Sequence, residues 1–234
     1  MELFTKRFDD ENYPSPTSLA ELSNEESILK WLNPECKLLI EPHINFVKQI
    51  YNKHSSAGLK QETFSIWSPT YVLFVLRALG YDKDHSDEFS EICEKTRLYM
   101  ERRKAFRGGI SGLTYDNPHL VSNYSAIMTL ALIGTDSAYE IIDRTAMYEA
   151  LLALKYEDGS FRTTLGMEHD IRATYTALLI ADTLNILTPE LTKDVDKYVL
   201  SCARYDGGFG PNPGIESHGG YVHTAFGIMK ILGL

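Results

Sequence analysis

The sequence lacks the features that direct a chain to the membrane or to secretion. No apolar run approaches the roughly 20 residues that a membrane-spanning helix needs. The segment from Met1 to Asn12 is charged and contains no apolar stretch like that of a secretory signal. Only three cysteines are present, Cys36, Cys93 and Cys202, and their odd number and wide spacing favour reduced thiols over a disulfide framework. We therefore expect a cytoplasmic protein without a membrane span.

Basic residues are also in deficit. Lysine and arginine number 23 against 32 acidic residues, which gives a net charge of −9. The densest basic run, Arg102 to Lys104, falls at the end of a predicted helix, where cations complement the helix dipole. Binding to a nucleic-acid backbone needs a clustered basic face. The composition therefore predicts no nucleic-acid partner.

Sustained alternation of apolar and polar residues, the pattern of β-strands, is absent. Helical stretches of about 10 to 16 residues follow one another instead, separated by glycine, proline and aspartate. We therefore expect an all-α fold. Residues 1–40 are predicted to be a polar lead-in with one helix, which begins at a capping box of Ser23 and Glu26. Residues 41–234 are predicted to form one helical domain, since a chain of this length can bury its own core.

An internal repeat organises this domain. A plan of helix, glycine-aromatic loop, polar connector and second helix recurs at about residues 90–134, 143–187 and 190–234. The equivalent loop glycines are Gly108, Gly159 and Gly207, and the second step is slightly shorter than the first. The second helices keep the same two offsets, at Tyr124, Tyr175 and His223. Agreement at both ends of the repeat indicates one structural unit used three times.

A helical hairpin of this kind cannot bury its apolar face alone, so neighbouring hairpins must stack. The repeat therefore predicts either an open solenoid or a closed α/α barrel. Its inner helices are predicted at 122–134, 173–187 and 221–232, around a central cavity.

Three connectors that lead into the inner helices are unusually polar, at residues 116–119, 166–172 and 213–221. Their side chains would line the mouth of the cavity. Glu168 and Arg172 are four residues apart and form either a helical ion pair or part of a binding site. Asp170 is either a partner of the helix dipole or a member of the same site.

The third connector carries the most specific pattern, His218-Gly219-Gly220-Tyr221. A histidine ahead of two glycines at a helix start leaves backbone N–H groups exposed beside an imidazole. That arrangement suits a diphosphate or a carboxylate, and Tyr221 behind it suits an attached apolar tail. A purely structural role for the same residues stays open.

Four ordered segments carry a family resemblance: 117–120 leading to 131–135, then 157–161, 168–175 and 215–221. In this order and spacing they are similar to the β subunits of protein prenyltransferases, most closely those of farnesyltransferases. The resemblance runs from about Tyr99 to the C-terminus. It implies an all-α toroid of helical hairpins, present here as an incomplete barrel in a C-terminally truncated chain.

The resemblance also implies roles for individual residues. The isoprenoid diphosphate would be bound by His218, Gly219, Gly220, Tyr221, Arg172, Tyr175 and Thr224. The C-terminal carboxylate of a C-a-a-X protein substrate would be held, through water, by His119, Glu168 and Arg172. Thr224 departs from the family pattern, because farnesyltransferases usually have cysteine at this position.

The implied activity is transfer of an isoprenoid from farnesyl diphosphate to the cysteine thiol of C-a-a-X proteins, with zinc as cofactor and a prenyltransferase α subunit as partner. The family's zinc ligands are an Asp-x-Cys pair and a later histidine. This sequence contains no Asp-x-Cys. We therefore assign no metal ligand and no catalytic residue, and expect the chain alone to be inactive.

Other functions stay open. A geranylgeranyltransferase β subunit, of type I or of the Rab-directed type, fits many of the same motifs. A non-catalytic helical scaffold that has lost the zinc-binding half is a second alternative. A terpene cyclase is disfavoured, because the Asp-x-Asp-Asp motif that protonates substrate is absent.

Overall fold

The computed structural model describes residues 23–24, 38–56, 66–105, 109–111 and 119–234. The chain divides into two compact units, Met1–Glu41 and Pro42–Leu234, and nearly all described residues belong to the second. Some predicted features lie outside the described residues: Cys36, Gly108, the connector residues 116–118 and most of the helix predicted to begin at Ser23. Ser23 and Asn24 themselves are helical.

The regular secondary structure of the described residues is helical apart from one short hairpin, so the predicted all-α class is confirmed. Its elements in chain order are α3 (Ile40–Ser56), α5 (Trp67–Ala78), α6 (Tyr81–Asp84), α7 (Ser86–Glu101), α8 (Leu120–Ile133), α9 (Asp136–Tyr139), α10 (Arg144–Leu154), β1 (Phe161–Arg162), β2 (His169–Asp170), α11 (Ile171–Thr183), α12 (Pro189–Thr192), α13 (Val195–Ser201) and α14 (Gly219–Leu232). None of the described helices is both long and apolar enough to cross a membrane.

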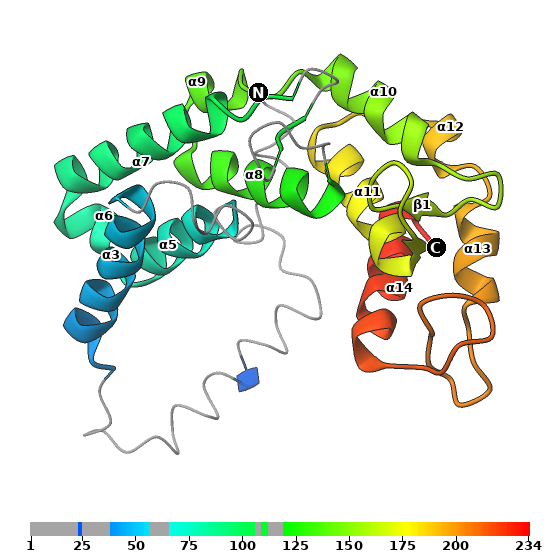
Figure 1. Cartoon of the computed structure of the whole chain (residues 1–234). Coiled ribbons are helices and arrows are strands. Elements are labelled where there is room, and N and C mark those ends of the chain that lie inside the picture. The colour runs from blue at the N-terminus through cyan, green and yellow to red at the C-terminus, as the bar shows by residue number, and fades with distance from the viewer. Residues whose placement is uncertain (1–22, 25–37, 57–65, 106–108, 112–118) are drawn as a thin grey trace. The chain divides into compact units, whose positions relative to one another are not determined.

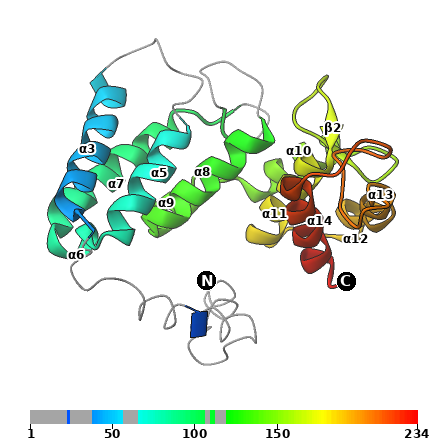
Figure 2. The same ribbon diagram turned by 90° about the horizontal axis from the view of Figure 1, so that it is seen from below.

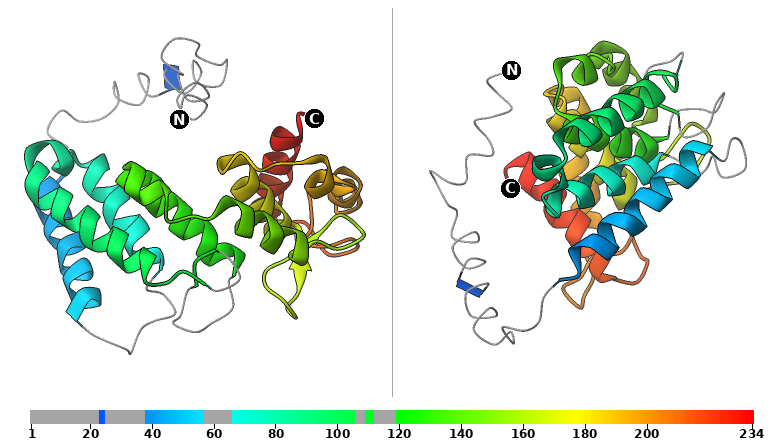
Figure 3. Two further views of the ribbon diagram at one scale, coloured as in Figure 1. Left: turned by 90° about the horizontal axis from the view of Figure 1, so that it is seen from above. Right: turned by 90° about the vertical axis from the view of Figure 1, so that its left-hand side faces the viewer.

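The helices of the second unit form two rows (Figure 1). In the inner row, α5 packs on α8, α8 on α11 and α11 on α14. The outer row consists of α7, α10 and α13, of which α7 packs on α8 and α13 on α14. Figures 2 and 3 show the neighbouring positions of α11 and α14 from further directions. Three helices of the inner row, α8, α11 and α14, are therefore those that follow the polar connectors.

Each outer helix ends in a loop that closes in the same way. Isolated antiparallel bridges join Lys104 to Ile110, Lys155 to Phe161 and Ala203 to Phe209, which keep the two offsets of the sequence repeat. Inside each bridge a backbone N–H donates to a carbonyl four residues on, in the pairs Ala105–Gly109, Tyr156–Ser160 and Arg204–Gly208. The sequence repeat is thus a repeat of backbone hydrogen bonds.

The inner helices α8, α11 and α14 also begin and end alike. Each begins after an extended N-cap residue, and these residues are His119, Asp170 and His218. A residue with positive φ follows each helix, directly at Gly134 and Gly233 and one residue later, after Leu184, at Asn185. The helices start about two residues before the predicted positions, because the capping side chains already satisfy the first free N–H groups.

Backbone hydrogen bonds join each inner helix to the next repeat. The first N–H of α8, at Leu120, donates to Thr163 O (2.9 Å), and the first N–H of α11, at Ile171, donates to Pro211 O (3.0 Å). Thr163 follows β1, which pairs antiparallel with β2. The connectors are consequently held in place by the helix start of the preceding repeat.

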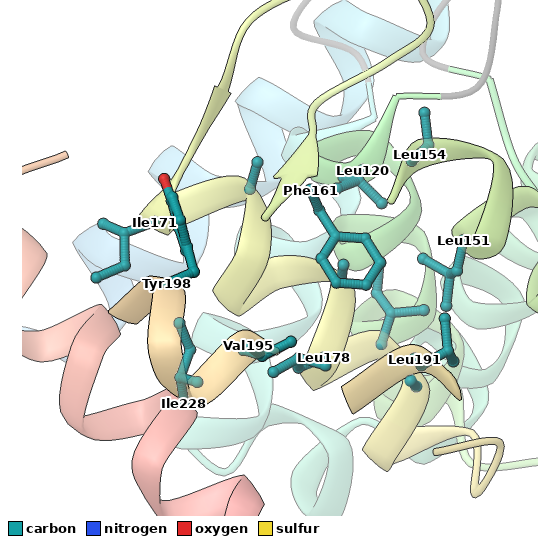
Figure 4. Close-up of a cluster of buried hydrophobic side chains, with 14 of the residues drawn as sticks. Leu120, Leu151, Leu154, Phe161, Ile171, Leu178, Leu191, Val195, Tyr198 and Ile228 are labelled. Atoms are coloured by element: carbon teal, nitrogen blue, oxygen red, sulfur yellow. The ribbon is translucent and has the colours of Figure 1, made fainter. Parts of the chain in front are cut away.

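A buried cluster lies under the second loop (Figure 4). Phe161 is fully buried at its centre, and its N–H donates to Thr174 Oγ1 (3.1 Å) on α11. Leu178 from α11 and Leu191 from α12 pack into the same cluster. Burying side chains of this size contributes roughly 1.5–3 kcal/mol each. A second cluster has the same arrangement around Ile110, whose N–H donates to Asn123 Oδ1 (2.6 Å).

Gly159 and Gly207 provide a matched test of the loop. Both have positive φ, at 94° and 83°. A Cβ at Gly159 would overlap the carbonyl group of Asp194 and lie 2.8 Å from Val195 N, whereas a Cβ at Gly207 would meet nothing within 4 Å. We expect Gly207→Ala to lower the free energy of unfolding by about 1 kcal/mol through backbone strain alone. Gly159→Ala should cost about 3 kcal/mol, because packed backbone must also move. Urea denaturation measures both, and equal losses would contradict the packing explanation.

Lys155 follows the end of α10, and its side chain reaches the buried cluster around Phe161. Its Nζ donates to Leu191 O (2.9 Å) and lies 4.7 Å from the centre of the Phe161 ring. Burial lowers the pKa of Lys155 to about 8 from its ordinary value of 10.5. Between these two pH values the unfolded chain therefore binds more protons than the native chain.

We expect the contribution of Lys155 to the free energy of unfolding to rise between pH 8 and pH 10.5, the interval between its native and ordinary pKa. The measurement is the stability of the wild type minus that of Lys155→Met across this range. Lys197→Met is the control, because a hydrogen bond to Asp194 raises the pKa of exposed Lys197 above its ordinary 10.5, so the contribution of Lys197 should stay nearly constant across this range and fall only above pH 10.5. A Lys155 difference that is flat or falls with pH would show that its amine is not buried in this way.

Candidate functional site

Most of the predicted site residues lie at or near the N-terminal ends of the inner helices α8, α11 and α14. Asp170 Oδ1 accepts from the N–H groups of Arg172 (2.8 Å) and Ala173 (2.9 Å). His119 Nδ1 accepts from Val121 N, and His218 Nδ1 from Gly220 N, both at 3.1 Å. In a neutral ring with Nδ1 as acceptor the proton is on Nε2. The exposed His218 ring is therefore oriented to donate a hydrogen bond from Nε2.

Arg172 is fixed by Asp170. Its Nε and Nη2 donate to Asp170 Oδ2, at 2.9 and 2.5 Å, and this pairing is the largest cause of a raised pKa for Arg172. The Asp170 side chain is 4% exposed, whereas the Arg172 side chain is 61% exposed. A buried carboxylate thus holds an exposed guanidinium in one orientation, which suits recognition of an anion.

The alternative of an Arg172–Glu168 helical ion pair is wrong. Glu168 precedes the extended residues of β2, so the two residues do not share a helix, and Arg172 pairs with Asp170 instead. Glu168 is exposed, and its carbonyl accepts from Thr163 N (3.2 Å). Since Thr163 O accepts from Leu120 N, this hairpin brings Glu168 to the start of α8, which His119 caps.

Tyr221 joins the groups on α11 and α14. The guanidinium carbon of Arg172 lies 5.8 Å from the centre of the Tyr221 ring, within the range of a cation–π contact. The His218 ring lies 5.7 Å from the same ring, edge to face. Gly219 and Gly220, which separate His218 from Tyr221 in the sequence, are both exposed. The structure therefore brings His218, Arg172 and Tyr221 together, and their binding of a diphosphate stays a prediction.

Aromatic rings continue along the inner row beyond this cluster. Tyr175 on α11 meets His223 on α14 edge to face at 5.9 Å, and Tyr124 on α8 lies 6.1 Å from Trp67 on α5. Burial is the main cause of a raised pKa for Tyr175, with a smaller contribution from Tyr124. Thr224 is buried and its hydroxyl donates to Tyr221 O (2.9 Å). This hydroxyl is therefore already used within the helix.

Sequence reasoning missed the clamp that Asp170 makes on Arg172, and it assigned no role to His223. A signal for Asp170 was present in the repeat. His119, Asp170 and His218 are separated by the same two offsets as the loop glycines, so all three could have been placed at the same N-cap position. The pairing with Arg172 leaves no such signal, because it depends on how β2 enters the helix.

Two other features of the described residues lie apart from this cluster. A cavity of about 330 Å³ is lined by residues of α5 to α9, including Arg77, Cys93 and Ile133, and none of the predicted site residues lines it. No group of three or more histidine, cysteine, aspartate or glutamate side chains among the described residues is arranged to hold a metal ion.

Known proteins are similar to this chain both in sequence and in fold. The family model described as "Prenyltransferase alpha-alpha toroid domain" matches residues 38–234. The protein farnesyltransferase subunit beta of Pisum sativum is 30% identical over 195 residues, which are 83% of this chain and 45% of the pea protein. The geranylgeranyl transferase type-1 subunit beta of Arabidopsis thaliana is 35% identical over 122 residues, 52% of this chain and 32% of that protein.

A solved structure described as "Candida albicans protein geranylgeranyltransferase-I complexed with GGPP" superposes with a TM-score of 0.64 at 20% identity. The match covers 85% of this chain and 60% of that one. The chain thus spans less than half the length of the two curated relatives named above. Sequence and fold agree, and the chain belongs to the prenyltransferase α/α toroid family, among the protein prenyltransferase β subunits.

Proposed function

We propose that the chain is part of a protein farnesyltransferase β subunit, which transfers a farnesyl group from farnesyl diphosphate to the cysteine thiol of C-a-a-X proteins. The observation that carries the proposal is the cluster of His218, Arg172 and Tyr221 at the N-terminus of α14. It combines two anion-binding groups with an aromatic ring, at one end of a row of aromatic side chains. Farnesyl diphosphate has the matching parts, an anion joined to an apolar chain.

The diphosphate is proposed to bind at the start of α14. The start of a helix carries partial positive charge, and neither Gly219 nor Gly220 has a side chain to keep a phosphate away. The Gly220 N–H already donates to His218 Nδ1, so the Gly219 N–H is the one proposed to face the diphosphate. Arg172 adds a full positive charge whose direction Asp170 sets. His218 adds an N–H donor. In the transfer, the cysteine thiol loses its proton to solvent and its sulfur bonds to C1 of the farnesyl group as the C1–O bond breaks. The diphosphate leaves with the electron pair of that bond, so negative charge grows on it beside these groups.

The apolar chain is proposed to run along the aromatic residues of the inner row. Tyr221 and Tyr175 offer ring faces next to the diphosphate position, and Tyr124 and Trp67 extend the apolar surface across α8 and α5. Thr224 is buried beneath Tyr221. An isoprenoid that lies here would bury apolar area against these rings, which stabilises the complex.

The protein substrate is proposed to approach from the side of the β1–β2 hairpin. The hydrogen bonds at Thr163 bring the start of α8, with His119, close to Glu168. Arg172 lies just beyond β2 in the chain and is exposed. These polar groups would hold the C-terminal carboxylate of the peptide, in part through water.

Zinc is the family's cofactor, but the residues present do not fit a zinc site. The sequence has no Asp-x-Cys, and the described residues contain no ligand cluster. We therefore assign donor anchoring and peptide binding to this chain and derive no step through the metal. An α subunit is the proposed partner, because the matching relatives are named as β subunits.

A geranylgeranyltransferase is the second candidate. The 35% identity to a type-1 geranylgeranyl transferase subunit favours it, and Thr224 departs from the farnesyltransferase pattern. A non-catalytic scaffold that binds donor without transfer is the third candidate, favoured by the missing zinc ligands. The two enzymes differ in the donor they prefer, and the scaffold differs from both in lacking transfer.

One experiment separates these candidates. The full chain, co-expressed with a prenyltransferase α subunit, is titrated with fluorescent analogues of farnesyl and geranylgeranyl diphosphate, and then supplied with zinc and a C-a-a-X peptide. Tighter binding of the farnesyl donor supports our proposal, and tighter binding of the longer donor supports the second candidate. Because the sequence lacks the zinc ligands, no modification is expected from this chain in either case; binding of the C-a-a-X peptide to the donor-loaded complex supports part of an enzyme, and donor binding without peptide binding supports the scaffold. Binding of neither donor would overturn the proposal.

His218→Ala tests the anion site in the same titration. Loss of one hydrogen bond to a charged group should raise the Kd for farnesyl diphosphate about 10-fold, which is about 1.4 kcal/mol. His43→Ala is the matched control, because His43 is an exposed histidine of α3 and should leave the Kd unchanged. An unchanged Kd for His218→Ala would contradict the assigned diphosphate position.

A further inference from the structure

Gly227 lies in the interior of α14, where glycine is less favourable than alanine because it has more backbone freedom to lose. Its φ is not positive, so no turn requires a glycine here. A Cβ at this position would overlap Tyr175 Cε2 and lie 3.0 Å from Tyr175 Cδ2 and Cζ. The Tyr175 ring therefore rests directly on the bare backbone of α14.

His223 holds the same ring from one helical turn earlier. The His223 and Tyr175 rings are 5.9 Å apart at an interplanar angle of 80°. Residues four apart lie on the same face of a helix, so His223 and Gly227 together form a seat for the Tyr175 ring. The imidazole meets the ring edge to face, and the glycine gives it room.

The repeat provides an internal comparison. Tyr124 on α8 is the equivalent of Tyr175, and Leu179 on α11 is the equivalent of Gly227. Between α8 and α11, the position that corresponds to the glycine of the seat is therefore occupied by a leucine. Tyr124 has its ring contact with Trp67 on α5, on the opposite side of α8 from α11. The two equivalent tyrosines therefore turn toward different neighbours.

We propose that Gly227 is a positioning residue that seats the Tyr175 ring on α14 and so leaves the wall between Tyr124 and Tyr175 open for the isoprenoid chain. This proposal rests on the proposed function. With a side chain at position 227, the Tyr175 ring would have to swing away from α14, back over α11 and toward Tyr124. The ring would then occupy part of the surface along which the donor lies.

A double-mutant cycle tests the seat without any ligand. We compare the melting temperatures of the wild-type chain, Gly227→Ala, Tyr175→Ala and the double variant by circular dichroism. Gly227→Ala should lower the melting temperature by about 4 °C, because the new methyl group displaces the ring. In the Tyr175→Ala background the same change should raise it by about 2 °C, because alanine favours the helix. Gly219→Ala, where a Cβ meets nothing within 4 Å, is the stability control and should cause no loss. A loss of equal size in both backgrounds would overturn the seat.

Donor binding tests the positioning role. Gly227→Ala should raise the Kd for farnesyl diphosphate about 10-fold in the wild-type background and cause no further loss in Tyr175→Ala. An unchanged Kd for Gly227→Ala, beside the expected reversal in melting temperature, would overturn positioning and leave only packing. If the wild-type chain binds no farnesyl diphosphate, the proposed function and the role of Gly227 in donor binding both fail. The melting temperatures would still decide whether Gly227 seats the Tyr175 ring.

Discussion

The helices of the inner row depend on how their first backbone N–H groups are satisfied. An α-helix leaves these groups without partners, and burying them unpaired would cost about 1–3 kcal/mol each. In α8 and α11 the first N–H donates to a carbonyl of the following repeat, and a capping side chain accepts from one or two of the next. The same bonds that complete a helix therefore fasten one hairpin to its neighbour. This explains why the repeat offsets reappear in the caps, the bridges and the left-handed helix ends.

The candidate site uses these helix starts with small changes of side chain. At α11 the cap is a buried carboxylate, whose second oxygen aims Arg172 outward. At α14 the cap is an exposed histidine followed by two glycines, and its Nδ1 accepts from Gly220 N. A fold that stacks equivalent helix ends at one side also gathers their N–H groups there. The start of α14 is where we propose that the diphosphate binds.

Packing between inner helices decides how the rings behind this site are directed. Tyr124 and Tyr175 occupy equivalent positions, yet one contacts Trp67 and the other rests on Gly227 beside His223. At the equivalent position of the following inner helix, one repeat has Leu179 and the next has Gly227. Close-packed interiors respond in this way, since a change of even a few atoms redirects a large side chain.

The sequence by itself determined the helical class and the two offsets of the repeat, and its resemblance to the prenyltransferase β subunits placed His218, Arg172 and Tyr221 in one predicted site. Helix periodicity, loop glycines and N-terminal motifs are local properties that a linear pattern records. Only the tertiary structure decided that Arg172 pairs with Asp170 rather than Glu168, that the half-buried Lys155 lies against the Phe161 ring, and that Tyr175 leans on α14. Each depends on the entry angle of a strand into a helix or on residues brought together from separate repeats. Spacing along the chain carries no record of such contacts, because they are set by the space that neighbouring elements leave.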